Sequence, residues 1–166
     1  DWVEKRGNSS ASDVQAKATG NKLRGGWLYA PGANISLFYI RANQRNNASL
    51  ASLGSDLTQN GMGVVWEHTF GNFAVEVNYS RLKDISGCSV SANCADTSNN
   101  TWFVGGRYNL SKRTHLLAYY LQYKNDRNYN ADPFAGGMSS AGAGGLPVAS
   151  NGADPKLYGV GMLHNF

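Results

Sequence analysis

The chain has 166 residues, of which only 16% are charged, while Gly occurs 20 times and Tyr, Trp and Phe together 19 times. No run approaches the ~18 consecutive apolar residues of a membrane-spanning helix, which excludes a helical membrane protein. The net charge is +4, but the 15 Lys and Arg residues are scattered singly or in short pairs. Nucleic acid is therefore not an expected partner, because its binding needs a basic patch.

Nothing in the composition marks a domain boundary, so residues 1–166 are treated as a single unit. The sequence opens at Asp1 with neither Met nor a signal-type segment, and we expect a processed product or a piece of a longer chain. Cys88 and Cys94 lie in a polar, turn-rich segment, which predicts a local disulfide and an oxidising compartment. Their spacing does not fit a zinc site, and neither a metal nor a cofactor is expected.

Eight segments are predicted to be β-strands, most of them with period-two alternation of apolar and small or polar residues. In chain order they are residues 1–6, 21–30, 34–42, 61–70, 73–80, 100–110, 114–124 and 156–166. The clearest alternation places Phe73, Val75, Val77 and Tyr79 opposite polar or small residues. Segments 34–42 and 114–124 are apolar on both faces, so the sequence does not assign their sides.

The connections between these strands alternate in length. Long polar connections at 7–20, 43–60, 83–99 and 125–155 alternate with short turns at 31–32, 71–72 and 111–113. Strands of about ten residues with short turns at one end and long loops at the other are typical of transmembrane β-barrels. We therefore predict an all-β, antiparallel, up-and-down transmembrane barrel with about eight strands here, closed alone or with further strands, because lipid tolerates no unpaired backbone.

Two motifs near the carboxyl end resemble a known family. LSKRT at 110–114 and GVGMLHNF at 159–166 are similar to the trimeric general porins of Gram-negative bacteria, betaproteobacterial type. Met162 stands where the family usually has Leu, and Leu163 and Asn165 stand where it usually has Arg. The resemblance implies the carboxyl-terminal half of a sixteen-stranded barrel, with the constriction loop outside this sequence.

The same resemblance implies a function and a location. The expected protein is a homotrimeric channel in the outer membrane of a Gram-negative bacterium, surrounded by membrane lipid and lipopolysaccharide, for passive diffusion of ions and small hydrophilic solutes. The outer-membrane assembly machinery is expected to read the alternating terminal row, which consists of Tyr158, Val160, Met162, His164 and Phe166. No catalytic constellation is recognised, so an enzyme is not expected.

Five charged residues fall on the small or polar rows of their strands and are candidates for the pore wall. They are Lys22, Arg24, Glu67, Glu76 and Arg107. One interpretation is a charged wall that tunes ion selection, as substitutions in barrel lumens do. The other is that these charges pair across the lumen and serve solvation and stability alone.

Aromatic residues gather toward both ends of the strands, as in the two interfacial girdles of a membrane protein. Trp2, Tyr79, Trp102 and Tyr158 lie toward the long loops, and Trp27, Tyr29, Phe70, Tyr108 and Phe166 toward the short turns. All three histidines, His68, His115 and His164, also fall at the short-turn level. We interpret them as interfacial residues rather than as a metal or pH-sensing site.

Two other classes of protein fit parts of the pattern. A self-contained eight-stranded barrel acting as an anchor or adhesin would have its interior filled by side chains. A soluble secreted β-sandwich would need no detergent. Inward rows rich in Gly, Ser and Asn favour the wide, water-filled pore over the filled barrel, which would need bulk or paired charges inside.

Overall fold

The computed structural model describes residues 2–8, 15–45, 54–132 and 150–166. Its eight strands are β1 (Trp2–Asn8), β2 (Gln15–Ala30), β3 (Ala33–Arg45), β4 (Asp56–Phe70), β5 (Phe73–Leu82), β6 (Asn99–Asn109), β7 (Thr114–Asn125) and β8 (Lys156–His164). One short 3-10 helix, η2 (Ser91–Cys94), lies between β5 and β6. In the described ranges, no helix has the length and apolarity to cross a membrane.

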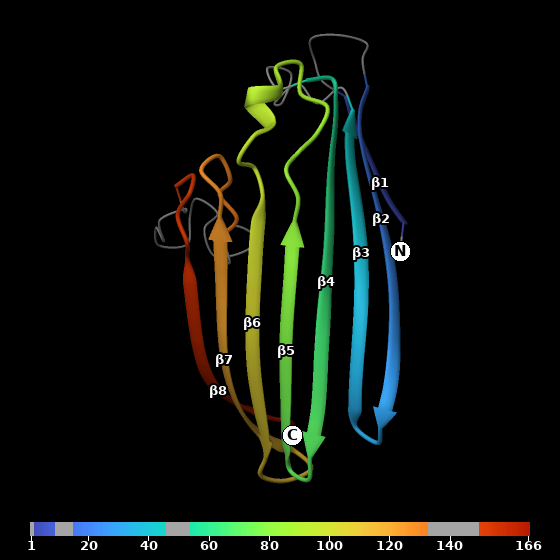
Figure 1. Ribbon diagram of the computed structural model, residues 1–166. Coiled ribbons are helices and arrows are strands. Elements are labelled where there is room, and N and C mark those ends of the chain that lie inside the picture. The colour runs from blue at the N-terminus through green and yellow to red at the C-terminus, as the bar shows by residue number, and fades with distance from the viewer. Residues whose placement is uncertain (1, 9–14, 46–53, 133–149) are drawn as a thin grey trace.

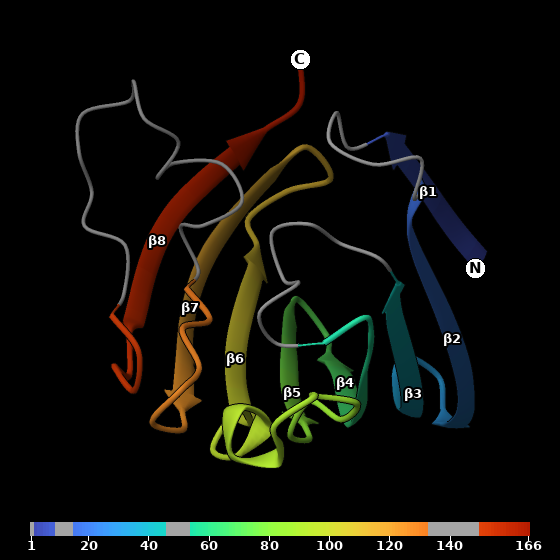
Figure 2. The same ribbon diagram turned by 90° about the horizontal axis from the view of Figure 1, so that it is seen from above.

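All eight strands form one antiparallel sheet in sequence order, so each strand pairs with its neighbours in the chain. The strands stand side by side with the short turns at one end (Figure 1). Viewed along the strands, the sheet bends into an open arc, with β1 and β8 at its two ends (Figure 2). Within the described residues β1 and β8 each have a single partner strand, and the arc is not closed.

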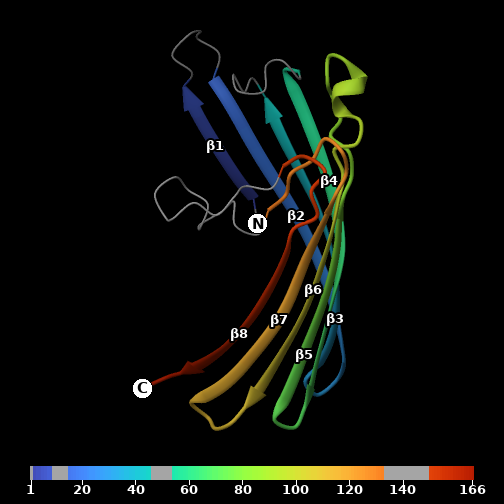
Figure 3. The ribbon, with the colours of Figure 1, turned by 90° about the vertical axis from the view of Figure 1, so that its left-hand side faces the viewer.

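The first four strands, β1 to β4, are longer at the long-loop end than the sequence predicted. The polar segment 7–20 was expected to be a loop, but β1 continues to Asn8 and β2 begins at Gln15. Likewise β3 extends to Arg45 and β4 begins at Asp56, both inside the predicted connection 43–60. Apolarity marks only where side chains are buried or meet lipid, whereas the backbone ladder continues through polar residues. The ladder therefore continues beyond the apolar residues, and β1 to β4 reach further toward the long-loop end than β5 to β8 (Figure 3).

The short turns are made by residues suited to tight reversal. Gly32 and Gly71 have φ angles of 74° and 58°, in the left-handed region that glycine adopts without a Cβ penalty. In the β6–β7 turn, the Ser111 Oγ accepts hydrogen bonds from the backbone N–H groups of Arg113 and Thr114, both at 3.1 Å. These local bonds fix the register of each hairpin.

The pairing register divides the side chains between two faces, because directly opposed residues of antiparallel strands project to the same side. We call one the convex face. It carries Leu23, Trp27, Tyr29, Ile35, Leu37, Tyr39, Met62, Val64, Trp66, His68, Phe70, Phe73, Val75, Val77, Tyr79, Trp102, Val104, Tyr108, Leu116, Ala118, Tyr120, Tyr158, Val160 and Met162. The register thus also assigns β3 and β7, which the sequence alone left open.

The opposite, concave face holds the more deeply buried side chains of the strands. Ser36, Leu57, Val65 and Asn99 lie on it and are at most 7% exposed. Side chains on the inner side of a curved sheet converge and cover one another, which agrees with the arc of Figure 2. Apart from Ala33, which is buried on the convex side, the buried side chains of the described strands form this thin layer on the inner side.

Aromatic rings on the concave face lie flat over glycines of neighbouring positions. A Cβ added to Gly63 would come within 2.4 Å of the Phe38 ring, and one added to Gly105 within 2.8 Å of the Phe103 ring. The ring of Tyr119, on β7, covers Gly159 of β8 in the same way. Glycine at these positions makes room for an aromatic side chain to lie along the wall rather than project from it.

Candidate functional site

All five charged residues selected from the sequence lie on the concave face. Lys22 and Arg24 are on β2, Glu67 and Glu76 are on β4 and β5, and Arg107 is on β6. Arg24 donates a hydrogen bond from Nη2 to Ser36 Oγ at 2.9 Å, and the Lys22 ammonium lies 5.6 Å from the centre of the Phe38 ring. Both cations are therefore held along the wall by their neighbours on β3.

The two acidic residues are direct cross-strand partners. Glu67 and Glu76 oppose each other in the β4–β5 register, an arrangement of like charges that destabilises a sheet. Glu67 Oε2 accepts a hydrogen bond from Asn34 Nδ2 at 3.1 Å. The pair lines a hollow of about 570 Å³ on the concave face, which Arg107 and Tyr119 also line. The hollow is therefore bordered by two carboxylates and one guanidinium group.

The concave face is not uniformly polar. Phe103, Leu117, Tyr119, Leu121 and Leu157 project from β6, β7 and β8 on the same side as the charged residues. The expectation that inward rows are mainly Gly, Ser and Asn is thus wrong for this part of the sheet. It rested on the strands with clean alternation and left out β7, whose two faces are both apolar.

The convex face has the layered composition of a membrane-facing surface. Its middle is aliphatic, and aromatic residues flank it at the short-turn end (Trp27, Tyr29, Phe70, Tyr108) and at the long-loop end (Tyr39, Tyr79, Trp102, Tyr158). Tyr39 and Tyr79 donate from their hydroxyls to Asn60 and Asn100, at 2.8 and 2.9 Å. These bonds mark the level at which the apolar zone meets polar side chains, as expected of interfacial tyrosines.

This boundary is oblique to the strand register. On β2 to β4 the first apolar residues are Leu23, Tyr39 and Met62, which share one register row. On β7 and β8 they are Tyr120 and Tyr158, whose row lies nearer the short turns. A level boundary crosses register rows obliquely when the strands are tilted, as they are in transmembrane barrels.

At the short-turn end, a network links β2 to β4 across β3. The Tyr29 hydroxyl accepts from Trp66 Nε1 and hydrogen-bonds to His68 Nδ1, both at 2.8 Å. The His68 ring stacks on Phe70 with centroids 3.9 Å apart. Ala33, the first residue of β3, is fully buried. Sequence reasoning missed this network, because alternation shows which face a residue takes but not which neighbour it reaches.

The three histidines do not form one cluster. His115 hydrogen-bonds to Asn109, and His164 to Thr114, whereas His68 belongs to the Tyr29 network. Among the residues that the structure describes, no group of three potential metal ligands occurs.

The long-loop end carries an ordered connection between β5 and β6. Cys88 and Cys94 are joined by a disulfide. Thr97 fastens the same segment, because its Oγ1 donates to Cys94 O at 2.6 Å and its N–H donates to Asp84 at 2.9 Å. Asn128, after β7, donates to Ala95 O at 2.9 Å. The disulfide segment is therefore tied to a neighbouring loop as well as closed on itself.

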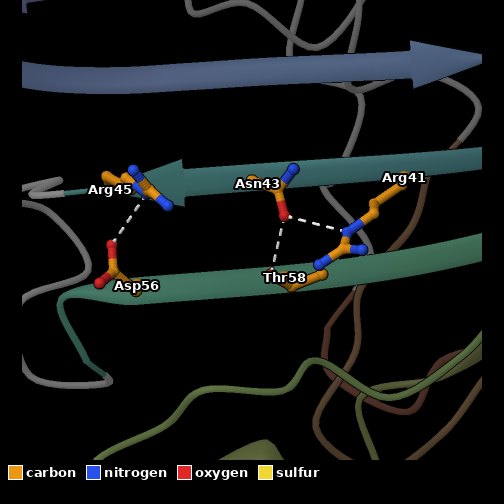
Figure 4. A network of polar contacts seen from close by, with 5 residues as sticks. All are labelled: Arg41, Asn43, Arg45, Asp56 and Thr58. Carbon is orange, nitrogen blue, oxygen red and sulfur yellow. Dashed lines mark hydrogen bonds and ion pairs between the residues drawn. The ribbon is translucent and has the colours of Figure 1, made fainter.

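A second polar network extends the convex face above its apolar zone (Figure 4). Asn43 Oδ1 accepts hydrogen bonds from Arg41 Nε at 3.3 Å and from Thr58 Oγ1 at 2.8 Å. Arg45 and Asp56 form an ion pair at 3.4 Å, with both side chains 68% exposed. An exposed pair of this kind contributes about 1 kcal/mol at most. The network thus holds polar side chains in place at the end of the β3–β4 ladder.

An antiparallel sheet with an apolar, aromatic-bordered convex face and a charged concave face is what the wall of an outer-membrane channel requires. Comparison with protein families supports this class, since a family model described as Gram-negative porin matches residues 5–130. The chain belongs to the Gram-negative porin family, and so to the non-enzymatic channel proteins of the outer membrane. The curated proteins and the solved structures that were compared gave no match.

Proposed function

We propose that the eight strands form part of the wall of a water-filled barrel, through which ions and small hydrophilic solutes diffuse passively. The observation that carries this proposal is the separation of the two faces. The five charged residues chosen from the sequence share the concave face, while the convex face has no Asp, Glu, Lys or Arg between its two aromatic borders in the described strands.

The open arc supports a barrel of more than eight strands. An exposed strand edge in lipid leaves a row of backbone N–H and C=O groups without partners, at a cost of several kcal/mol for each group. The free edges of β1 and β8 in the described residues therefore call for further strands, and we infer a sixteen-stranded barrel from the family resemblance. On the same basis we infer a homotrimer.

One observation favours the second candidate, a self-contained eight-stranded anchor or adhesin. Bulky concave residues such as Phe38, Leu117, Tyr119 and Leu121 could fill a narrow interior. Conductance separates the two candidates, because a filled barrel passes little current and a wide pore passes a stable one. Planar-bilayer recording of the purified protein in KCl makes this measurement.

Ion selectivity tests the role of the charged wall. Replacing Arg24 and Arg107 by Glu reverses two concave charges, and we expect the anion-to-cation permeability ratio to fall by about twofold or more. The measurement is the reversal potential under a KCl gradient. Arg41→Glu is the matched control, because it reverses a basic residue on the convex side and should leave the ratio unchanged. An unchanged reversal potential in the Arg24 and Arg107 variant would show that these residues do not line the conducting path.

The terminal row is our candidate for the assembly signal. Tyr158, Val160 and Met162 on β8 are 71%, 89% and 67% exposed, and Phe166, just beyond the strand, is also fully exposed. We infer that the assembly machinery binds the row that these residues form with His164 before this row is inserted into lipid.

A further inference from the structure

The hollow on the concave face lies where the charged part of the wall meets its apolar part. Glu67, Glu76 and Arg107 line it from β4, β5 and β6, and Leu117 and Tyr119 line it from β7. Its volume of about 570 Å³ is in the range of small-molecule sites, which also combine apolar surface with a few polar groups. The hollow is on the inner side of the arc (Figure 2), where a solute in the pore reaches it.

One register row sets the layout of this hollow. Four consecutive cross-strand partners lie at one level of the concave face, and they are Glu67, Glu76, Gly105 and Tyr119. Neighbouring strands are about 4.8 Å apart, which puts the backbones of Glu76 and Tyr119 about 10 Å from each other. Gly105, between them, contributes no side chain, and the Phe103 ring lies flat over it. The row therefore presents carboxylates on one side and aromatic rings on the other, with a low floor between them.

Two aromatic rings form the apolar side of the row. The centroids of Phe103 and Tyr119 are 6.3 Å apart, and the two ring planes differ by 24°. The Tyr119 ring lies over Gly159 of the next strand, and the residue is 40% exposed. Rings that lie along a wall offer their faces to a solute. Because the face of an aromatic ring is its negative side, it attracts the weakly positive C–H groups of a ligand.

The polar side offers both acceptors and donors. The Glu67 and Glu76 carboxylates accept hydrogen bonds, and the Arg107 guanidinium donates them. In the described part of the chain, neither Glu76 nor Arg107 forms a hydrogen bond or an ion pair. A simple cation or anion in this hollow would meet a group of its own sign. Hydroxyl groups both donate and accept, so a polyhydroxylated solute can bond to all three residues.

We propose that the hollow is a binding site for a pyranose-type sugar. One C–H face of the sugar ring packs on Phe103 and Tyr119, and its hydroxyl groups hydrogen-bond to Glu67, Glu76 and Arg107. Such a site makes the passage of sugars saturable, which sieving by pore width does not. The proposal rests on the proposed function, because it takes the concave face to be the wall of a water-filled pore.

Saturation-transfer NMR of the purified full-length protein in deuterated detergent tests this site with glucose as the probe. Glucose should bind saturably, and the protons of one C–H face should receive the strongest saturation, because they contact the rings. Choline and acetate, each with a single charged group, serve as competitors and should not displace glucose. A saturable signal from choline or acetate with none from glucose would identify an ion site and overturn the proposal.

Variants of the polar side test the hydrogen bonds. Glu67→Gln/Glu76→Gln replaces two charged acceptors by neutral, weaker ones, and it should lower the affinity for glucose by about tenfold or more. Asp56→Asn is the matched control, because it makes the same kind of change at the exposed end of β4, away from the hollow, and should leave the affinity unchanged.

A second pair of variants tests the aromatic side. Tyr119→Leu keeps an apolar side chain but removes the ring face, and it should weaken glucose binding several-fold. Tyr120→Leu changes the next residue, on the convex face, and should bind normally. Circular dichroism of each variant confirms that it is folded. Equal affinity of the native protein and both variants of the hollow would overturn the proposal.

Planar-bilayer recording keeps this result apart from the test of the proposed function. A protein that binds glucose in detergent but does not conduct refutes the channel and leaves the sugar site standing. A protein that conducts stably but shows no saturable glucose signal refutes the sugar site alone.

Discussion

The convex and concave faces of this sheet are built by the same strands, yet they follow different rules. The convex face has an apolar middle on every strand from β2 to β8, bordered by aromatic residues at one or both ends. The concave face changes along the arc, from charged residues on β2 to β6 to aromatic and aliphatic ones on β6 to β8. A face in contact with lipid experiences one uniform solvent, whereas a face toward a lumen can differ from strand to strand.

A charge placed in the apolar middle of the convex face should have the largest effect on the stability of the protein. Val77→Arg places a charge in the middle of the apolar zone, in one row with Trp66 and Val104. We expect a loss of about 2–4 kcal/mol in the free energy of folding into lipid, the cost of Arg at the midplane of a barrel. Urea titration of the protein folded into liposomes measures it. Asn78→Arg, one residue along on the concave face, should cost far less, and equal losses would refute the assignment of the faces.

The next largest effect on stability is expected from a substitution in the close packing of the concave face. A Cβ at Gly63 would meet the Phe38 ring at 2.4 Å and the backbone oxygen of Tyr79 at 2.7 Å, and the latter cannot move away easily. Gly63→Ala should therefore destabilise the protein by about 1–3 kcal/mol through overpacking. A Cβ added to Gly25, on the convex face, would have no neighbouring atom within 4 Å, so Gly25→Ala should be neutral. Denaturation midpoints of the two variants compare the faces directly.

The Tyr29 network should contribute less, because it lies at the exposed border of the convex face. Tyr29→Phe removes the hydroxyl that joins Trp66 and His68, which we expect to cost about 1–2 kcal/mol for two hydrogen bonds. Tyr108→Phe is the control, since no hydrogen bond of its hydroxyl is seen in the described structure. Thermal unfolding of both variants in detergent tests the difference. If the two variants unfold alike, the network does not join β2 to β4 in solution.

The smallest effect on the sheet is expected from the disulfide loop. Cys88→Ser/Cys94→Ser opens a closed segment of seven residues, for which chain entropy predicts about 2 kcal/mol at most, confined to the loop. Protease cleavage between β5 and β6 should become faster while the unfolding of the sheet is unchanged. Unaltered cleavage would mean that Thr97 and Asn128 hold the segment without the disulfide.

The bounds and the faces of some strands could be predicted from the sequence alone, and those of others could not. Segment 73–80 alternates cleanly, and the structure places β5 there with the predicted sides. The two faces of β7 are both apolar, and only pairing with β6 shows that Tyr119 is inside and Tyr120 outside. The polar ends of β2 and β4 were missed because ladder hydrogen bonds need no apolar side chains.

The candidate site was predicted in part. Alternation sufficed to group Lys22, Arg24, Glu67, Glu76 and Arg107 on one face, since each lies on a strand with a clear small or polar row. Register was needed to see that Glu67 and Glu76 are direct partners. The motif resemblance came from residues 110–166, whereas the family model matches 5–130 and so includes strands for which only the alternation of loops had suggested this family.

The borders of the convex face also set the thickness of the membrane that the sheet can span. The apolar row spans nine residues on β4, from Met62 to Phe70, and seven on β5, from Phe73 to Tyr79. At about 3.4 Å per residue these rows are roughly 20–27 Å long, and tilt shortens their height further. A strand tilt of about 40° reduces these lengths to a height of roughly 16–21 Å, which is thinner than both the ~25 Å apolar band of outer-membrane barrels and the ~30 Å core of a typical bilayer. Strand length alone would thus make the protein a poor fit to thicker membranes, where mismatch would have to compress the lipid around it.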